Sequence, residues 1–157
     1  MSLASFEQLI FHLSEALDTE LHLDEHNICT LLINDLFTVQ LELDSREELL
    51  IMGCFLTILA PGSYRSKTFK AILNANEGFH SKEGILSFVP KNNMLFIHKK
   101  YPINHLDGPT LLEMLMNMVI KGSEWKEAIE KGKIAPSSIA IPQNERGKGH
   151  FEPGIKT

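Results

Sequence analysis

The chain has 157 residues, of which 43% are hydrophobic and 22% are charged, and its formal net charge is -5. These proportions are typical of a soluble globular protein, and the length suits one domain whose core needs no disulfides. The negative charge disfavours a nucleic-acid-binding surface. The start of the chain lacks the features of a signal peptide, and the longest apolar run, residues 49–61, is too short to cross a bilayer as a helix. We therefore expect neither export by a signal peptide nor membrane insertion.

The first predicted elements are a helix and a β-hairpin. Apolar residues recur every three or four positions over residues 2–18, with polar residues on the rest of the helical wheel, which predicts an amphipathic helix. Two runs rich in aliphatic residues follow, 28–33 and 37–43, with the turn-forming pair Asn34-Asp35 between them. The second run alternates apolar and polar residues, so one of its faces belongs to the core and the other meets solvent or a partner.

The first and third predicted strands are apolar on both faces. In the first, Ile28 and Leu32 lie on the face opposite Cys29, so this second apolar face needs a cover. The third strand lies within residues 46–60 and is expected in the middle of the sheet, with a layer or a partner on each side. Gly53 in its centre predicts a bulge or the close approach of another backbone.

The second half of the chain predicts a helix, another hairpin and a long final helix. The helix covers residues 63–76, and the hairpin strands cover 84–89 and 94–98. The last helix begins at an Asp-Gly-Pro sequence, in which Asp107 serves as the N-cap, and its buried stripe ends near Ile129. The fold class that follows is α+β, with the order α-β-β-β-α-β-β-α. Residues 132–157 are rich in glycine and proline and predict a flexible tail after a domain at 1–131.

No residue pattern typical of catalysis or metal binding is present in the sequence. The best histidine pair, His22 and His26, lies beside Asp24 and Glu25, which favours a solvated loop over a metal site. Cys29 and Cys54 have apolar neighbours, which favours buried thiols over a reactive nucleophile or a disulfide. We therefore expect no catalytic residue, no metal and no cofactor. An enzyme that uses Cys29 or the histidine pair is kept as a third hypothesis.

In this order, the predicted elements resemble class I type III secretion chaperones, the Tir chaperone family. The resemblance rests on the hairpin NICTLLINDLFTVQLEL, the segment LLIMGCFLTILAPG, the helix end FKAILNANEG, the strand pair ILSFVPKNNMLFIHKKYPINHLDG and the last helix with Trp125. It covers about residues 3–130, and its specificity lies in the combination. Asn27 stands where the family often has glycine, and the tail is longer than the resemblance accounts for.

The resemblance implies a strongly twisted antiparallel sheet packed with helices, in a homodimer of the bacterial cytoplasm without enzymatic activity. It implies that the dimer binds the N-terminal region of secreted effector proteins and keeps it extended and competent for secretion. Effector side chains would enter apolar grooves beside the first helix and the sheet, and an effector strand would add to a sheet edge. The secretion-system ATPase is a further partner that the resemblance suggests.

Two sets of residues are expected to make these contacts. The effector-binding residues are Leu9, Leu13, Ile28 and Leu32, for which burial in the domain's own core is equally open. The dimer-interface residues are Phe55, Phe69, Ile72 and Leu73. The methionines Met114, Met116 and Met118 are either core residues or an adaptable binding surface. The alternative function is a small α/β module that holds an apolar small molecule in a pocket under the first helix.

Overall fold

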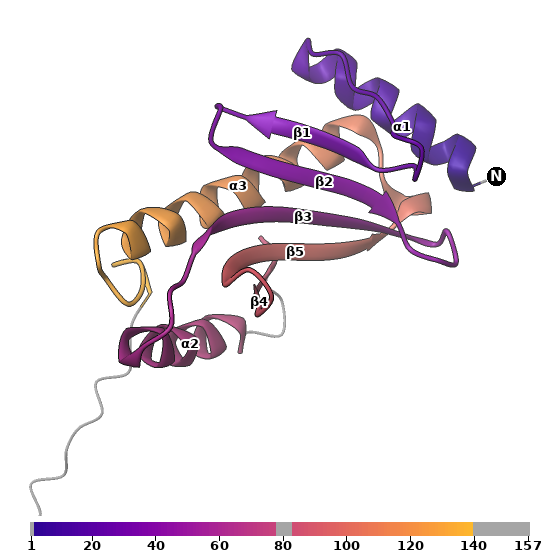
Figure 1. Cartoon of the computed structure of the whole chain (residues 1–157). Helices are drawn as coiled ribbons and strands as arrows, with labels where there is room; N and C mark the ends of the chain where they lie inside the picture. The colour runs from indigo at the N-terminus through magenta and orange to yellow at the C-terminus, as the bar shows by residue number, and fades with distance from the viewer. Residues whose placement is uncertain (1, 78–82, 140–157) are drawn as a thin grey trace, which may run out of the picture.

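A computed structural model describes residues 2–77 and 83–139 of the chain. The elements follow the predicted order, with one short 3-10 helix added before the last helix (Figure 1). They are α1 (Ser2–Leu17), β1 (Cys29–Ile33), β2 (Phe37–Leu43), β3 (Leu49–Ile58), α2 (Ser63–Asn76), β4 (Ile85–Val89), β5 (Met94–Pro102), η1 (Ile103–His105) and α3 (Gly108–Glu130). The predicted α+β class is therefore confirmed.

The five strands form one antiparallel sheet in the order β1-β2-β3-β5-β4. β3 is central and pairs with β2 on one side and β5 on the other, as its apolar character on both faces predicts. Strands β1 and β4 are the two edges of the sheet.

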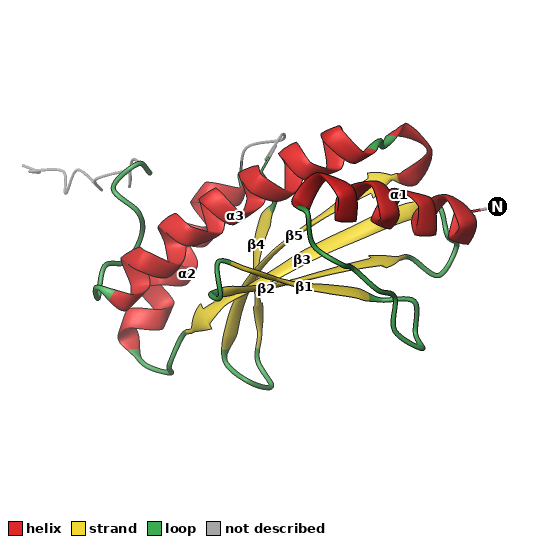
Figure 2. Cartoon of the chain, turned by 90° about the horizontal axis from the view of Figure 1, so that it is seen from above, coloured by secondary structure: helices red, strands yellow, loops and turns green. Residues whose placement is uncertain are grey.

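Helices α1 and α3 lie side by side over one face of the twisted sheet, and α2 lies near the C-terminal end of α3 (Figure 2). No described helix covers the opposite face, which we call the open face and which faces the viewer in Figure 1. The core fills the space between the sheet and the helices. Its largest fully buried side chains include Trp125, Phe6, Leu13, Met52 and Ile97.

Asparagine and aspartate residues make the turns because their side chains tolerate the left-handed backbone region. Asn34 and Asp35 have φ angles of 52° and 55°, and the Leu36 N–H donates to the Ile33 carbonyl to close the β1–β2 hairpin. Asn27, with φ 59°, adopts the same region before β1. Asn27 therefore adopts a backbone conformation that glycine would also adopt readily.

The structure differs from the sequence-based expectations for two strands. The expected bulge at Gly53 is wrong, because Gly53 pairs regularly with Gln40 and His98, and no backbone lies within 4 Å of where its Cβ would be. The irregularity in β3 lies instead between Phe55 and Thr57, where Leu56 is the extra residue. β5 also runs past the expected end at His98 as far as Pro102, because its last residues pair with the start of β3.

Residues 132–139 were expected in the tail, and the structure describes them packed on the domain. Ala135 is buried, and the Tyr64 hydroxyl donates to the Lys133 carbonyl at 2.5 Å. The remainder of the expected tail, residues 140–157, lies outside the described residues.

Candidate partner-binding face

The open face is built by every second residue of the strands, and its centre is formed by β2, β3 and β5. Because side chains alternate along a strand, Leu50, Met52 and Cys54 of β3 enter the core while Ile51 and Phe55 lie on the open face. The strand register places neighbours in rows across the sheet, so that Gly53 lies between Gln40 on β2 and His98 on β5. The open face is thus apolar along β3, with the polar Gln40 on one side of Gly53 and the polar His98 on the other.

A hollow of about 270 Å³ lies on this face over Gly53. It arises because glycine has no side chain, and a Cβ added at Gly53 would meet nothing within 4 Å. The residues that line the hollow are Gln40, Glu42, Ile51, Gly53, Cys54, Phe55, Val89, Phe96 and His98. We call it the Gly53 hollow.

Aromatic contacts fix one wall of the Gly53 hollow. The Phe96 ring stacks on the His98 ring with centroids 5.3 Å apart, and the Phe55 ring lies 6.2 Å from Phe96. His98 Nδ1 lies 3.2 Å from the Ser87 hydroxyl. Burial, with a smaller contribution from the Lys100 charge, lowers the pKa of His98 below its ordinary value. The imidazole is therefore neutral near pH 7, and the hollow keeps an uncharged wall.

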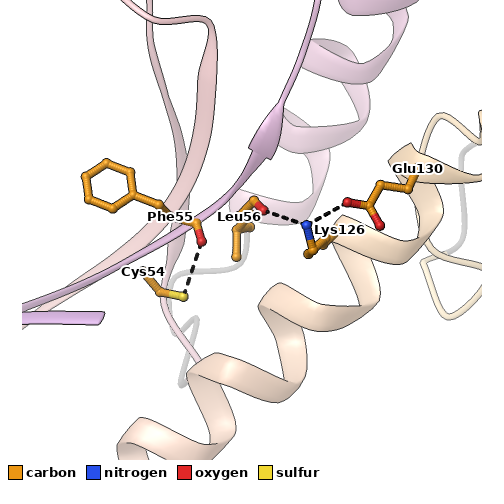
Figure 3. A network of polar contacts seen from close by, with 5 residues as sticks. All are labelled: Cys54, Phe55, Leu56, Lys126 and Glu130. Atoms are coloured by element: carbon orange, nitrogen blue, oxygen red, sulfur yellow. Dashed lines mark hydrogen bonds and ion pairs between the residues drawn. The ribbon is translucent and has the colours of Figure 1, made fainter. Parts of the chain in front are cut away.

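The far side of β3 is held by α3 at the bulge (Figure 3). Lys126 Nζ donates to the Leu56 carbonyl at 3.3 Å and to Glu130 Oε1 at 2.6 Å. The Phe55 ring points away from α3, on the other side of the strand from Leu56 (Figure 3). The bond from Lys126 to the Leu56 carbonyl satisfies an acceptor at the irregular point of the strand, and it joins α3 to the sheet on the side opposite Phe55.

The sequence profile of the Tir chaperone protein (CesT) family matches residues 8–126, which is most of the chain. The chain belongs to this family. The match covers the whole sheet and nearly all of α3, so it includes the open face and the Gly53 hollow. No curated protein matches the sequence in a direct search.

Solved structures of secretion chaperone complexes share the fold of this chaperone. A chain of the HopA1-SchA chaperone-effector complex has a TM-score of 0.68 and 22% identity, covering 82% of this chain and 98% of that one. A second match is a chain from the crystal structure of the Yersinia pestis type III secretion chaperone SycH in complex with a stable fragment of YscM2. Its TM-score is 0.63 and its identity 20%, and the match covers 75% of this chain and 97% of that one. A chain of the ExoT-SpcS complex of Pseudomonas aeruginosa has a TM-score of 0.58 and 20% identity, and the match covers 78% of this chain and 96% of that one.

The four residues expected to bind effector do not form one surface in the chaperone. Leu9 and Leu13 of α1 are buried in the core, with 4% and 0% of their surface exposed. Ile28 is half-buried before β1, and Leu32 of β1 is 62% exposed on the open face. Leu32 therefore remains available to a partner, whereas the structure packs Leu9 and Leu13 between α1 and the sheet.

The four residues expected at a dimer interface also have different surroundings. Leu73 of α2 is 69% exposed, whereas Ile72 beside it is buried. Phe69 packs edge-on against Phe88 of β4 at 4.9 Å, and Phe55 lines the Gly53 hollow. Leu73 is thus the member of this set that is free to meet a second copy.

The remaining residues that the sequence singled out have plain structural roles. Cys29 and Cys54 are buried free thiols, and burial raises their pKa values to about 11 and 12. His22 and His26 are exposed and lie 3.2 and 3.5 Å from Glu20 and Glu25. Among residues 2–77 and 83–139, no cluster of three potential ligands is present, and no helix is long and apolar enough to span a membrane.

The methionines of α3 divide between the two interpretations that the sequence left open. Met118 is fully buried, Met114 is half-buried against the core and Met116 is partly exposed. The sequence analysis did not single out Phe96 and His98, which form a wall of the Gly53 hollow, because both appeared only as strand residues. The glycine within the apolar third strand was the signal that pointed to this place.

Proposed function

We propose that the chaperone binds the N-terminal region of type III secretion effectors in the bacterial cytoplasm, holds it extended and thereby keeps it competent for secretion. The observation that carries this proposal is the family match over residues 8–126. The solved structures with the same fold include the HopA1-SchA chaperone-effector complex, which supports the same role. The family consists of chaperones, so we propose no enzymatic activity for this chain.

The structure favours β1 as the edge where an effector strand is added. An edge strand presents unpaired backbone groups that a polypeptide can use. The edge at β4 is partly occupied, because the Asn76 side chain at the end of α2 bonds both the N–H and the carbonyl of Leu86. The β1 edge is bridged by Leu23 at its first residue, Cys29, and farther along it Leu32 and Leu36 are 62% and 63% exposed, which offers apolar contacts beside the strand.

We also propose that the chaperone is a homodimer, with Leu73 of α2 in the interface. Leu73 is the most exposed of the large apolar side chains in the described part of the chain. Ile72 and Phe69 would then support this contact from within each protomer. An interaction of the chaperone with the secretion ATPase belongs to the same proposal.

The alternative, a module that binds an apolar small molecule under α1, is not favoured. Leu9 and Leu13 fill the space between α1 and the sheet. The Gly53 hollow lies on the other face and, at about 270 Å³, is smaller than most small-molecule sites.

Co-expression with effector N-terminal segments from the same genome tests the proposed function. We expect a complex of two chaperone chains with one segment, measured by light scattering, and we expect the segment alone to aggregate. A segment from a protein exported by a signal peptide serves as the control and should not co-purify. A chaperone that elutes as a monomer without any effector segment would contradict the proposal.

A further inference from the structure

We propose that the Gly53 hollow receives one bulky apolar side chain of a bound effector segment and that Glu42 pairs with a lysine or arginine two positions away in that segment. This inference rests on the proposed function, because it specifies how an effector is recognised. It predicts that the chaperone prefers segments in which one residue lies between an apolar residue and a basic residue.

The shape of the hollow fits a single side chain. Its floor is the Gly53 backbone, and Ile51, Phe55 and Phe96 supply apolar walls. The volume of about 270 Å³ is below the range usual for cofactors and drug-sized ligands. An apolar side chain in this position would be removed from water without any movement of the sheet, because the space over Gly53 is already present.

The charge near the hollow favours a basic residue in the segment. Glu42 is the only carboxylate that lines the hollow, and in the part of the chain that the structure describes it has no ion pair. Lys100, on the same row of the sheet, is separated from Glu42 by Ile51 of the central strand. The carboxylate is therefore available to a cation from a partner.

The spacing along the sheet matches the spacing of an extended segment. Glu42 lies two residues beyond Gln40, which is opposite Gly53, so the two positions are about 7 Å apart along β2. Residues i and i+2 of an extended chain lie on one side at the same separation. A segment that lies along β2 thus places an apolar side chain over Gly53 and the basic residue over Glu42.

A second copy of the chaperone is the other possible occupant, since Phe55 belongs to the residues expected at the dimer interface. The centres of homodimer interfaces are depleted in charged residues. The hollow does not have this composition, because it is lined by the charged Glu42 and by the neutral but polar Gln40 and His98. This composition suits a segment whose own polar backbone and basic side chain need partners.

The test compares the wild-type chaperone with Gly53→Leu on an array of synthetic peptides that tile the N-terminal regions of the effectors encoded in the same genome. A Cβ at position 53 meets no atom within 4 Å, the rest of the leucine extends into the hollow, and a side chain in place of glycine favours the strand, so the variant should fold. We expect peptides with the apolar-x-basic pattern to bind Gly53→Leu roughly tenfold more weakly or worse. Gly53→Ala should give a smaller loss.

A second variant tests the charge. Glu42→Gln should weaken binding of the same peptides by roughly two- to fivefold, and it should not affect peptides in which glutamine replaces the basic residue. Glu113→Leu, which adds a leucine at an exposed position of α3 on the other side of the sheet, is the matched control and should bind as the wild type does.

The outcomes separate this inference from the proposed function. If the wild type binds no peptide, the proposed function fails, and the inference fails with it. If the wild type binds and Gly53→Leu binds equally well, only the inference is overturned. If Gly53→Leu is a monomer, while Glu42→Gln stays dimeric and binds every peptide as tightly as the wild type does, the hollow belongs to the second copy and the inference is also overturned.

Discussion

Lys126 joins α3 to the one irregular point of β3. Its ammonium group satisfies the Leu56 carbonyl at the bulge and pairs with Glu130, and its side chain is mostly buried. Removal of one partner leaves a buried acceptor unsatisfied. We expect Lys126→Met to lower the free energy of unfolding by about 1–2 kcal/mol, measured by urea denaturation.

Lys131→Met provides the matched control for this prediction. Lys131 forms the same kind of pair, with Glu127 four residues earlier, but both side chains are exposed and no strand carbonyl is involved. Exposed pairs of this kind contribute little, so the unfolding midpoint should hardly move. Equal destabilisation by the two variants would show that the bond to Leu56 contributes nothing.

The buried thiols make the fold sensitive to alkaline pH. The pKa values of Cys29 and Cys54 are raised from 9.0 to about 11 and 12, because burial disfavours the thiolate. The folded protein therefore binds more protons than the unfolded chain above pH 9, so the free energy of unfolding should fall as the pH rises from about 9 toward 12. Urea titrations across this range measure the slope. Cys54→Val, which keeps an apolar side chain of similar size, should show a shallower slope.

Among the elements, α2 closes part of the β4 edge through Asn76. The Asn76 amide donates to the Leu86 carbonyl at 2.7 Å, and its oxygen accepts from the Leu86 N–H at 3.0 Å. Asn76→Ala leaves both backbone groups without this partner and should lower the free energy of unfolding by about 1–3 kcal/mol. Asn74→Ala, at an exposed position of the same helix turn, is the control and should have little effect. Hydrogen exchange at Leu86 that is unchanged in Asn76→Ala would contradict this role.

The sequence predicted every α-helix and strand, though not the short η1, because each of these elements carried its own periodic pattern or turn chemistry. The alternation in β2, the Asn34-Asp35 turn and the N-cap at Asp107 all appear in the structure as predicted. The bulge at Leu56 was not predictable, because it lies within a long, mostly apolar run and no local pattern distinguishes the extra residue.

The assignment of surfaces was harder to predict than the elements. The apolar stripe of α1 was predicted, but periodicity alone does not distinguish burial against the sheet from a groove for a partner, and Leu9 and Leu13 proved to be buried. Ile72 and Leu73 are consecutive residues with opposite environments, which depend on how α2 packs. The Gly53 hollow required the strand register, which brings Gln40 and His98 to its two sides.

For the whole molecule, the exposed apolar surface of α2 predicts the dimer interface. Leu73→Asp places a charge where we propose that a second copy packs, and light scattering should show a monomer. Leu73 is a better site for this test than Phe69, whose ring packs on Phe88 within the protomer. Lys67→Asp, at another exposed position of α2, is the control and should remain dimeric. A Leu73→Asp protein with the mass of a dimer would place the interface elsewhere.

The strand order has a consequence for the synthesis of the chaperone. β3 lies between β2 and β5, and β5 follows α2 and β4 in the chain. While a ribosome makes these later segments, one long edge of the apolar β3 has no partner, and the core beneath it waits for α3, which is translated after every strand. Native pairing of β3 is thus completed only near the end of translation, and the nascent chain is exposed to aggregation until then. A protein that shelters other unfolded chains thus passes through a vulnerable stage of its own.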